Sequence, residues 1–348
     1  MRSNRIDGAV MESRYVDAAG LRMHYLDGGG SARPVIAIHG WPETSHEWVR
    51  IAPHLARSCR LLAVDTRGHG KTAAPANGYD RAQLARDVVA FMDALDIERC
   101  PVIAHDWGGI IACKLALDHP DRVERLCMMD TICTGWPVFV QYYYWFMDDD
   151  RAERFFAKYS RQFIEFLIGG RSPNGFPQPP ESPFQSDLNA MTAPHPWATD
   201  ADLAAYAEPY LRGDAVGVSC AYYRSLHFHR VIADRSAPNG ERYERVPASE
   251  MGRMWRRQDI KADYLDYAPE DRHKTYPGKT LWLYTKMVAM AAGSQTDARG
   301  IPRGDPAFEA FPRHFPNLEA IAVDAGHFFI EERPVETAAL LRNFLDGQ

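Results

Sequence analysis

Residues 104–109, Ala-His-Asp-Trp-Gly-Gly, decide the fold of this chain of 348 residues. They follow a short apolar run at 101–104 that is typical of a buried parallel strand, and the two glycines open a helical pattern. The small residues around Asp106 fit a sharp strand-to-helix turn that presents a catalytic nucleophile. A carboxylate in that position attacks a saturated carbon that bears a halide or an epoxide oxygen, and leaves an alkyl-enzyme ester.

Short apolar runs alternate with helical patterns on both sides of this turn. Strands are expected at 35–38, 61–64, 125–129, 280–284 and 320–323, with a hairpin over 15–26 and helices over 84–95, 108–118, 305–314 and 335–345. This order predicts an α/β protein with a parallel sheet covered by helices on both faces, whose functional side chains lie at the carboxyl ends of the strands. Four polar residues follow such strand ends: His39, Asp65, Asp106 and Asp130.

The alternation stops after about Thr134 and resumes at 280–284. The segment between is rich in aromatic residues, proline and charge, and we interpret it as a mainly helical insertion without sheet. Its proline-rich part, 171–196, is expected to be a loop. The predicted division is a first part of the core over 1–133, a cap domain over 134–276 and a second part of the core over 277–348.

Composition narrows the class of partner. A net charge of −6 without a dense Lys/Arg run disfavours nucleic acid and anionic membranes. No segment reaches the roughly 20 apolar residues of a spanning helix, and the N-terminal residues lack an apolar signal stretch, so we expect a soluble cytoplasmic protein. The six cysteines show no CxxC pairing and are expected to be reduced, buried thiols. We expect no metal and no cofactor, and a bulky, largely apolar small molecule as the substrate, and we leave a homodimer open.

Four motifs stand in order on the predicted strand ends: His39-Gly-Trp-Pro-Glu43, Asp65-Thr-Arg-Gly-His-Gly70, residues 104–109, and Gly326-His-Phe-Phe329. As a set they resemble the epoxide hydrolase and dehalogenase branch of the α/β-hydrolases. The resemblance covers the whole predicted core. It implies an α/β-hydrolase fold, with a mostly parallel eight-stranded sheet, flanking helices and a mainly helical cap.

The resemblance also implies catalytic roles. Asp106 is expected to be the nucleophile, and His327 the base that activates water against the ester. A third residue, an acid, holds the imidazole in the correct tautomer. Many relatives carry this acid after the strand that 280–284 represents, but here no acid follows that strand before Asp297. We therefore assign the role to Asp130, the position used by other members of the branch, with Asp297 as the alternative.

Further positions match the family pattern. The backbone N–H groups of Trp41 and Trp107 are expected to form the oxyanion hole. Tyr223 resembles the cap tyrosine that is aimed at the leaving atom, and Tyr144 or Trp145 stands where the family has a second donor. Trp107 does not discriminate between substrates, because epoxide hydrolases and haloalkane dehalogenases share the Asp-Trp pair.

Two positions near the nucleophile differ from the fluoroacetate dehalogenases, and these differences limit the class of substrate. Fluoroacetate dehalogenases hold the substrate carboxylate with arginines directly after the nucleophile and three positions later, where this chain has Trp107 and Ile110. A small haloacid is therefore disfavoured. The resemblance predicts a hydrolase that opens an epoxide to a diol. Hydrolysis of a carbon–halogen bond by the same residues is the alternative, and a non-catalytic receptor for a small ligand on the same fold is the alternative of another class.

Overall fold

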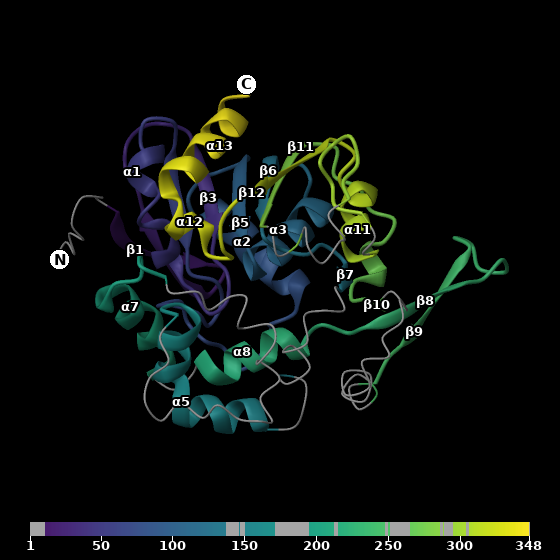
Figure 1. Ribbon diagram of the computed structural model, residues 1–348, viewed down its shortest axis with the longest axis horizontal. Coiled ribbons are helices and arrows are strands. Elements are labelled where there is room, and N and C mark those ends of the chain that lie inside the picture. The colour runs from purple at the N-terminus through teal and green to yellow at the C-terminus, as the bar shows by residue number, and fades with distance from the viewer. Residues whose placement is uncertain are drawn as a thin grey trace.

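The computed structural model describes residues 11–136, 146, 150–170, 195–211, 215–247, 250, 265–285, 288, 295–303 and 306–347. Its core is an eight-stranded sheet of order β1-β2-β4-β3-β5-β6-β11-β12 (Figure 1). The strands are β1 Glu12–Ala18, β2 Leu21–Asp27, β3 Pro34–Ile38, β4 Arg60–Val64, β5 Cys100–His105, β6 Val123–Met129, β11 Lys279–Thr285 and β12 Leu318–Val323. β1 pairs with β2 and β2 with β4 in antiparallel fashion, and the remaining pairs are parallel. The expected α/β-hydrolase sheet is confirmed.

Helices cover both faces of this sheet, which explains why its central strands are continuous apolar runs. Successive residues of a strand point to opposite faces. In β3, Ile36 and Ile38 pack with α2 (Arg81–Ala94) and α3 (Trp107–Asp118), whereas Val35 and Ala37 pack with α1 (Ala52–Leu55) and α13 (Pro334–Asp346). The described residues of the two core segments also form η1 Ser45–Trp48, α11 Pro306–His314 and α12 Phe329–Glu332, and η2 Pro269–Asp271 lies near the end of the expected cap.

Three further helices, α5 (Arg151–Leu167), α7 (Asp200–Leu211) and α8 (Ala215–Arg224), lie together below the core in Figure 1. They belong to the segment that we expected to be a cap. Polar contacts attach them to loops at the carboxyl ends of the strands. The hydroxyl of Tyr222 donates to the carbonyl of Arg67, which follows β4, and the indole N–H of Trp41, which follows β3, donates to Ser219 Oγ. The helices therefore cover the edge of the sheet where the candidate residues lie.

The same segment also contains a four-stranded antiparallel sheet of order β7-β10-β8-β9, so the expectation of an insertion without sheet is wrong. Its strands are β7 Gly135–Trp136, β8 His229–Ala233, β9 Glu241–Arg245 and β10 Leu265–Asp266. The β8–β9 hairpin extends away from the body of the molecule (Figure 1). Neither of its strands has a buried face, so no apolar alternation marks it. The available signals were the β-branched pair Val231-Ile232 and the turn dipeptide Asn239-Gly240.

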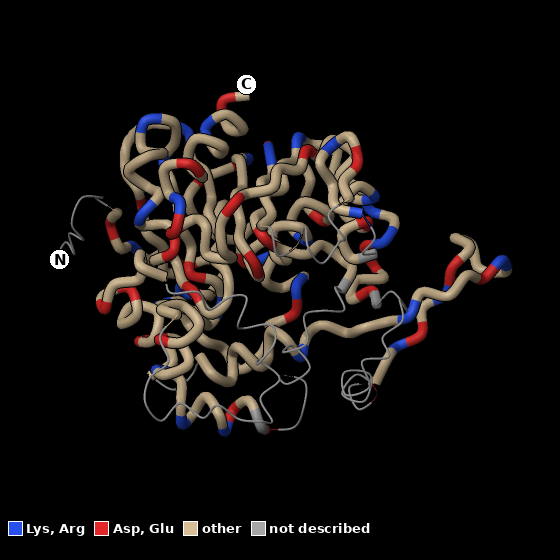
Figure 2. The backbone as a smooth tube through the Cα atoms, viewed as in Figure 1, with Lys and Arg blue, Asp and Glu red and all other residues tan. Residues whose placement is uncertain are grey.

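Basic and acidic residues are interspersed along the chain (Figure 2). None of the helices in the described residues combines the length and the apolar character that crossing a bilayer requires. All six cysteines are buried, as the sequence predicts.

Candidate active site

Asp106 lies in a strained turn between β5 and α3. Its backbone has φ 45° and ψ −117°, in the region that non-glycine residues rarely adopt. Two glycines allow the turn to be this tight. A Cβ at Gly108 would lie 2.3 Å from the carbonyl oxygen of Ile38, and one at Gly109 would lie 2.4 Å from Thr131 Cγ2. The helix thus meets the ends of β3 and β6 closely, and the Asp106 carboxylate is held at the carboxyl edge of the sheet.

His327 stands between two carboxylates. Its Nε2 lies 3.7 Å from Asp106 Oδ2, and its Nδ1 lies 2.5 Å from Asp130 Oδ2. Asp106 follows β5, Asp130 follows β6 and His327 follows β12, so three separate strand ends bring the three side chains together. All three are largely buried. The arrangement has the geometry of a nucleophile, a base and an orienting acid.

Asp130 keeps its negative charge despite its burial. Burial alone would raise its pKa, but the hydrogen bond and the charge of His327, together with the backbone amide of Thr285, lower the pKa of Asp130 below its usual value. Asp130 Oδ1 accepts from both the backbone N–H and the hydroxyl of Thr285, each at 3.0 Å. Asp297 is occupied elsewhere, because it accepts from the backbone N–H groups of Arg299 and Ile301 in its own turn. Thr285, which ends β11, was not singled out from the sequence.

One backbone N–H group contacts the Asp106 carboxylate, and a second belongs to the residue that follows it. The N–H of Trp41 donates to Asp106 Oδ1 at 2.8 Å. Trp107 is the first residue of α3, so its N–H belongs to the helix N-terminus, where backbone donors have no partner within the helix. Both features suit an oxyanion that forms on the nucleophile carboxyl.

Aromatic side chains from α8 cover this site. The ring of Tyr223 is buried and lies edge-on to Trp41 and Trp107, with ring centroids 5.4 Å and 5.1 Å away. It also stacks on Phe146 at 4.2 Å. Within the described part of the chain, the buried indole N–H of Trp107 has no hydrogen-bond partner. Tyr144 and Trp145, the other expected cap donors, lie outside the described residues.

Sequence reasoning missed a second buried cluster directly behind the first. His105 Nδ1 lies 3.1 Å from carboxylate oxygens of both Glu43 and Glu47, and His105 Nε2 lies 3.1 Å from the backbone oxygen of His327. A fourth residue, Glu331, accepts a hydrogen bond from Tyr206 of α7 at 2.7 Å. Glu43 belongs to a quoted motif and His105 precedes the nucleophile, but neither position indicated that the two side chains would meet.

The glutamates of this cluster lose their protons less readily than free glutamates do. Burial, followed by the neighbouring charge of Glu43, raises the pKa of Glu47 to about 7, and the same two causes raise the pKa of Glu331 well above its usual value. Burial opposes the charge of His105, yet Glu47 and Glu43 raise the pKa of His105 well above the ordinary one. One atom each of Glu43, Glu47 and His105 lie within 4.8 Å of one another, a spacing that would admit a cation. The close approach of these atoms is also explained without a cation, by protons shared between the carboxyl groups and by their contacts with His105.

A cavity of about 920 Å³ lies apart from these residues. It is lined by parts of β2, η1 and α7, including His24, Thr44 and Asp202. Asp106, Asp130 and His327 do not line it. The cavity is therefore separate from the cluster of Asp106, Asp130 and His327.

Comparison with known proteins shows the family and the fold. The chain matches the α/β hydrolase fold family over residues 33–334 and belongs to that family. It is 41% identical over 113 residues to the soluble epoxide hydrolase of Corynebacterium sp. (strain C12), which is 32% of this chain and 39% of that protein. It is 35% identical over 128 residues to the fluoroacetate dehalogenase of Burkholderia sp., covering 35% of this chain and 42% of that one. The match to the haloalkane dehalogenase of Mesorhizobium japonicum is 39% over 110 residues, or 32% and 36% of the two chains.

These matched segments span less than half the length of the curated relatives. Solved structures match over nearly the whole chain and show the fold. The epoxide hydrolase CorEH has a TM-score of 0.68 at 22% identity, covering 97% of this chain and 99% of that one. An epoxide hydrolase from an endophytic Streptomyces has a TM-score of 0.68 at 24% identity, covering 97% and 96%.

Proposed function

We propose that this protein is a cofactor-independent hydrolase that opens an epoxide to a diol through an alkyl ester on Asp106. The observation that carries the proposal is the Asp106 carboxylate itself. One of its oxygens accepts from the Trp41 amide, and the other lies 3.7 Å from His327 Nε2. A carboxylate held in this way can attack a saturated carbon. His327 then lies where a base can activate water against the resulting ester.

The first step forms the ester. An oxygen of Asp106 attacks a ring carbon of the epoxide, and the bond between that carbon and the ring oxygen breaks. The ring oxygen takes a proton from the Tyr223 hydroxyl, which becomes a phenolate. The position of the Tyr223 ring against Trp41 and Trp107 supports this role, because both tryptophans adjoin the nucleophile.

The second step hydrolyses the ester. His327 takes a proton from water, the hydroxide adds to the Asp106 carbonyl carbon, and the charge that develops on oxygen is stabilised by the N–H groups of Trp41 and Trp107. The intermediate collapses to the Asp106 carboxyl group and the alkoxide, which takes the carboxyl proton and leaves as the diol. The protonated His327 then returns a proton to the Tyr223 phenolate, which restores both side chains. The ionised Asp130 stabilises the imidazolium in between.

The proposed catalytic residues come from all three predicted segments of the chain. We assign the nucleophile and Asp130 to the first part of the core, 1–133, and His327 to the second part, 277–348. The cap, 134–276, supplies Tyr223 and the ring of Phe146 that stacks on it, and the core supplies Trp41 and Trp107. We expect the substrate to be a bulky, largely apolar small molecule, because the rings of Phe146, Trp41 and Trp107 surround this phenol.

Hydrolysis of a haloalkane is the second candidate. The observation that favours it is the indole N–H of Trp107, which has no partner among the described residues and is suited to hold a departing halide. An alkoxide needs the proton that a phenol supplies, whereas a halide needs only a hydrogen bond, so Tyr223 favours the epoxide. A haloacid is disfavoured because Trp107 and Ile110 offer no positive charge beside the nucleophile.

A turnover screen of epoxides, haloalkanes and haloacids tests the proposal, with diol and halide both measured. We expect diol from an epoxide and none from the Asp106→Ala variant. With excess enzyme and one turnover in heavy-oxygen water, the first diol should carry ordinary oxygen taken from Asp106. Full incorporation of solvent oxygen in the first turnover would refute the ester mechanism. Halide release without diol would favour the second candidate, and ligand binding without any product would favour a receptor.

A further inference from the structure

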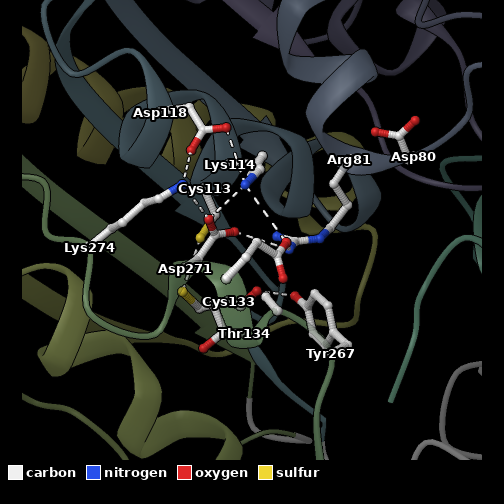
Figure 3. Close-up of polar contacts among 12 residues, drawn as sticks. Asp80, Arg81, Cys113, Lys114, Asp118, Cys133, Thr134, Tyr267, Asp271 and Lys274 are labelled. Carbon is white, nitrogen blue, oxygen red and sulfur yellow. Dashed lines mark hydrogen bonds and ion pairs between the residues drawn. The ribbon is translucent and has the colours of Figure 1, made fainter. Parts of the chain in front are cut away.

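Two of the six cysteines are in contact with each other. The sulfur atoms of Cys113 and Cys133 lie 3.0 Å apart, and both side chains are fully buried. A disulfide bond requires about 2.0 Å between the sulfurs, so an approach of about 1 Å would close the bond. Figure 3 shows the two sulfurs facing each other beside the buried ion pairs of Arg81, Lys114 and Asp271.

The backbone around Cys133 is fixed at both ends. Cys133 lies in the loop between β6 and β7, and its carbonyl accepts from the hydroxyl of Tyr267. The next residue, Thr134, accepts from the Tyr267 N–H at 3.0 Å. Before Cys133, the Thr131 hydroxyl donates to the backbone oxygen of Asp106 at 2.6 Å. These contacts hold Cys133 against α3, the helix that carries Cys113, so the two sulfur atoms can meet without a large change of the backbone.

We propose that Cys113 and Cys133 form a redox modification site, a dithiol that a hydroperoxide converts to a disulfide. One thiolate attacks the peroxide O–O bond and becomes a sulfenic acid, releasing water or an alcohol. The second thiol displaces water from that sulfenic acid and forms the S–S bond. Overall, two thiols lose two electrons and two protons, and one hydroperoxide is reduced to an alcohol, or to a second water when the oxidant is hydrogen peroxide.

The site joins two segments that hold the active site. Cys113 is on α3, whose first residue follows the nucleophile Asp106, and Cys133 follows Asp130 in the loop that leaves β6. The bond would therefore tie the helix behind the nucleophile to the loop that begins with the acid partner of His327. The reduced pair already lies in position, so the sulfenic acid formed on one sulfur meets its partner before a second oxidation.

The surroundings set the rate of the reaction. Burial and the hydrogen bond with Cys113 raise the pKa of Cys133 well above its ordinary value, although the nearby Arg81 guanidinium acts in the opposite direction. The thiolate is the reacting form, so oxidation should be slow at neutral pH and should accelerate as the pH rises. The oxidant also has to enter through local opening of the surrounding side chains, which makes hydrogen peroxide, the smallest hydroperoxide, the appropriate probe.

The native protein is treated with hydrogen peroxide at several pH values, the peroxide is removed, and the chain is unfolded and alkylated with iodoacetamide. We expect four alkylated cysteines instead of the six present in the chain, and a loss of two hydrogens per chain. Trypsin should release a cross-link between peptides 100–114 and 126–151, which dithiothreitol separates. Six alkylated cysteines after treatment at every pH would overturn the proposal.

The same two peptides also contain Cys100 and Cys127, which provide matched controls. Both are buried in the core like the proposed pair. The Cys100→Ala and Cys127→Ala variants should retain the cross-link, and Cys113→Ala and Cys133→Ala should lose it. A cross-link that persists in Cys113→Ala would overturn the assignment. If a variant does not fold, fragmentation of the cross-linked wild-type peptides identifies the joined cysteines directly.

Discussion

Two carboxylate–imidazole clusters meet at His327, and they differ in how many donors their carboxylates receive. On one side, Asp130 receives hydrogen bonds from His327 and twice from Thr285. On the other side, His105 approaches Glu43 and Glu47 together. In that second cluster one oxygen each of Glu43, Glu47 and Glu331 is buried without a hydrogen-bond partner in the described residues.

Burial is nearly the same in both clusters, so the neighbouring charges and the donors decide which carboxylates stay ionised. Glu43 and Glu47 repel each other, whereas Asp130 faces His327 and Thr285. The pKa of Asp130 is lowered, whereas the pKa of Glu47 is raised to about 7. A carboxylate supplied with donors stays ionised and can orient a catalytic imidazole, and carboxylates that share too few donors hold protons instead. His105 links the two clusters, since its Nε2 contacts the backbone oxygen of His327. We expect changes in the first cluster to affect turnover and changes in the second to affect stability.

The largest effect should come from His327→Ala. Ester formation needs no base, whereas ester hydrolysis does, so this variant should accumulate an alkyl-enzyme and stop after one turnover. Mass spectrometry of the intact chain should show an increase equal to the mass of the epoxide. Asp106→Ala is the control and should show no increase. A His327→Ala protein that binds the epoxide without acquiring the adduct would contradict the assigned role.

The meeting of Asp106, Asp130 and His327 could be predicted from the sequence because all three follow strand ends. Apolar runs fix where β5, β6 and β12 stop, and parallel strands bring those ends to one edge. The second cluster escaped prediction because Glu47 and Glu331 reach His105 and Tyr206 only through tertiary packing. The β8–β9 hairpin escaped prediction because neither strand has a buried face and β9 carries charge on both faces, so apolar and polar residues do not alternate in the sequence.

Asp130→Asn should slow ester hydrolysis by roughly 10⁴-fold, the scale seen when an imidazole loses its orienting carboxylate. Formation of the ester should change little, so rapid-quench measurements should separate the two steps. Asp297→Asn is the matched control, because Asp297 contacts amides in its own turn, and it should turn over like the wild type. Loss of turnover in Asp297→Asn with a normal Asp130→Asn would move the acid to the later strand.

Tyr223→Phe should lower the rate of ester formation from an epoxide by roughly 10²-fold, because the alkoxide loses its proton donor. The effect on a haloalkane should be far smaller, since a halide leaves without a proton. Tyr222→Phe is the control in the same helix, because the Tyr222 hydroxyl donates to the backbone of Arg67 instead. Equal losses with both substrate classes would show that the Tyr223 hydroxyl supports packing and not proton transfer.

The smallest effect should be on stability and should come from Glu47→Gln. The pKa of Glu47 rises from 4.5 to about 7 on folding, so the folded chain binds a proton that the unfolded chain releases, and stability falls as the pH rises across this range. A glutamine stays neutral and can still accept from the Gly40 amide, as Glu47 Oε2 does.

Above pH 7 the Glu47→Gln variant should therefore be more stable than the wild type by up to about 3 kcal/mol, and the difference should vanish near pH 4. Urea unfolding between pH 4 and pH 8 measures it. Asp297→Asn is the contrasting control, because the pKa of Asp297 is lowered, Asp297 is ionised above pH 5 in both the folded and the unfolded chain, and the stability curve of the variant should run parallel to that of the wild type in that range. If Glu47→Gln also ran parallel to the wild type across this range, Glu47 would be ionised in the folded chain, and the two clusters would not differ in the way that their donors indicate.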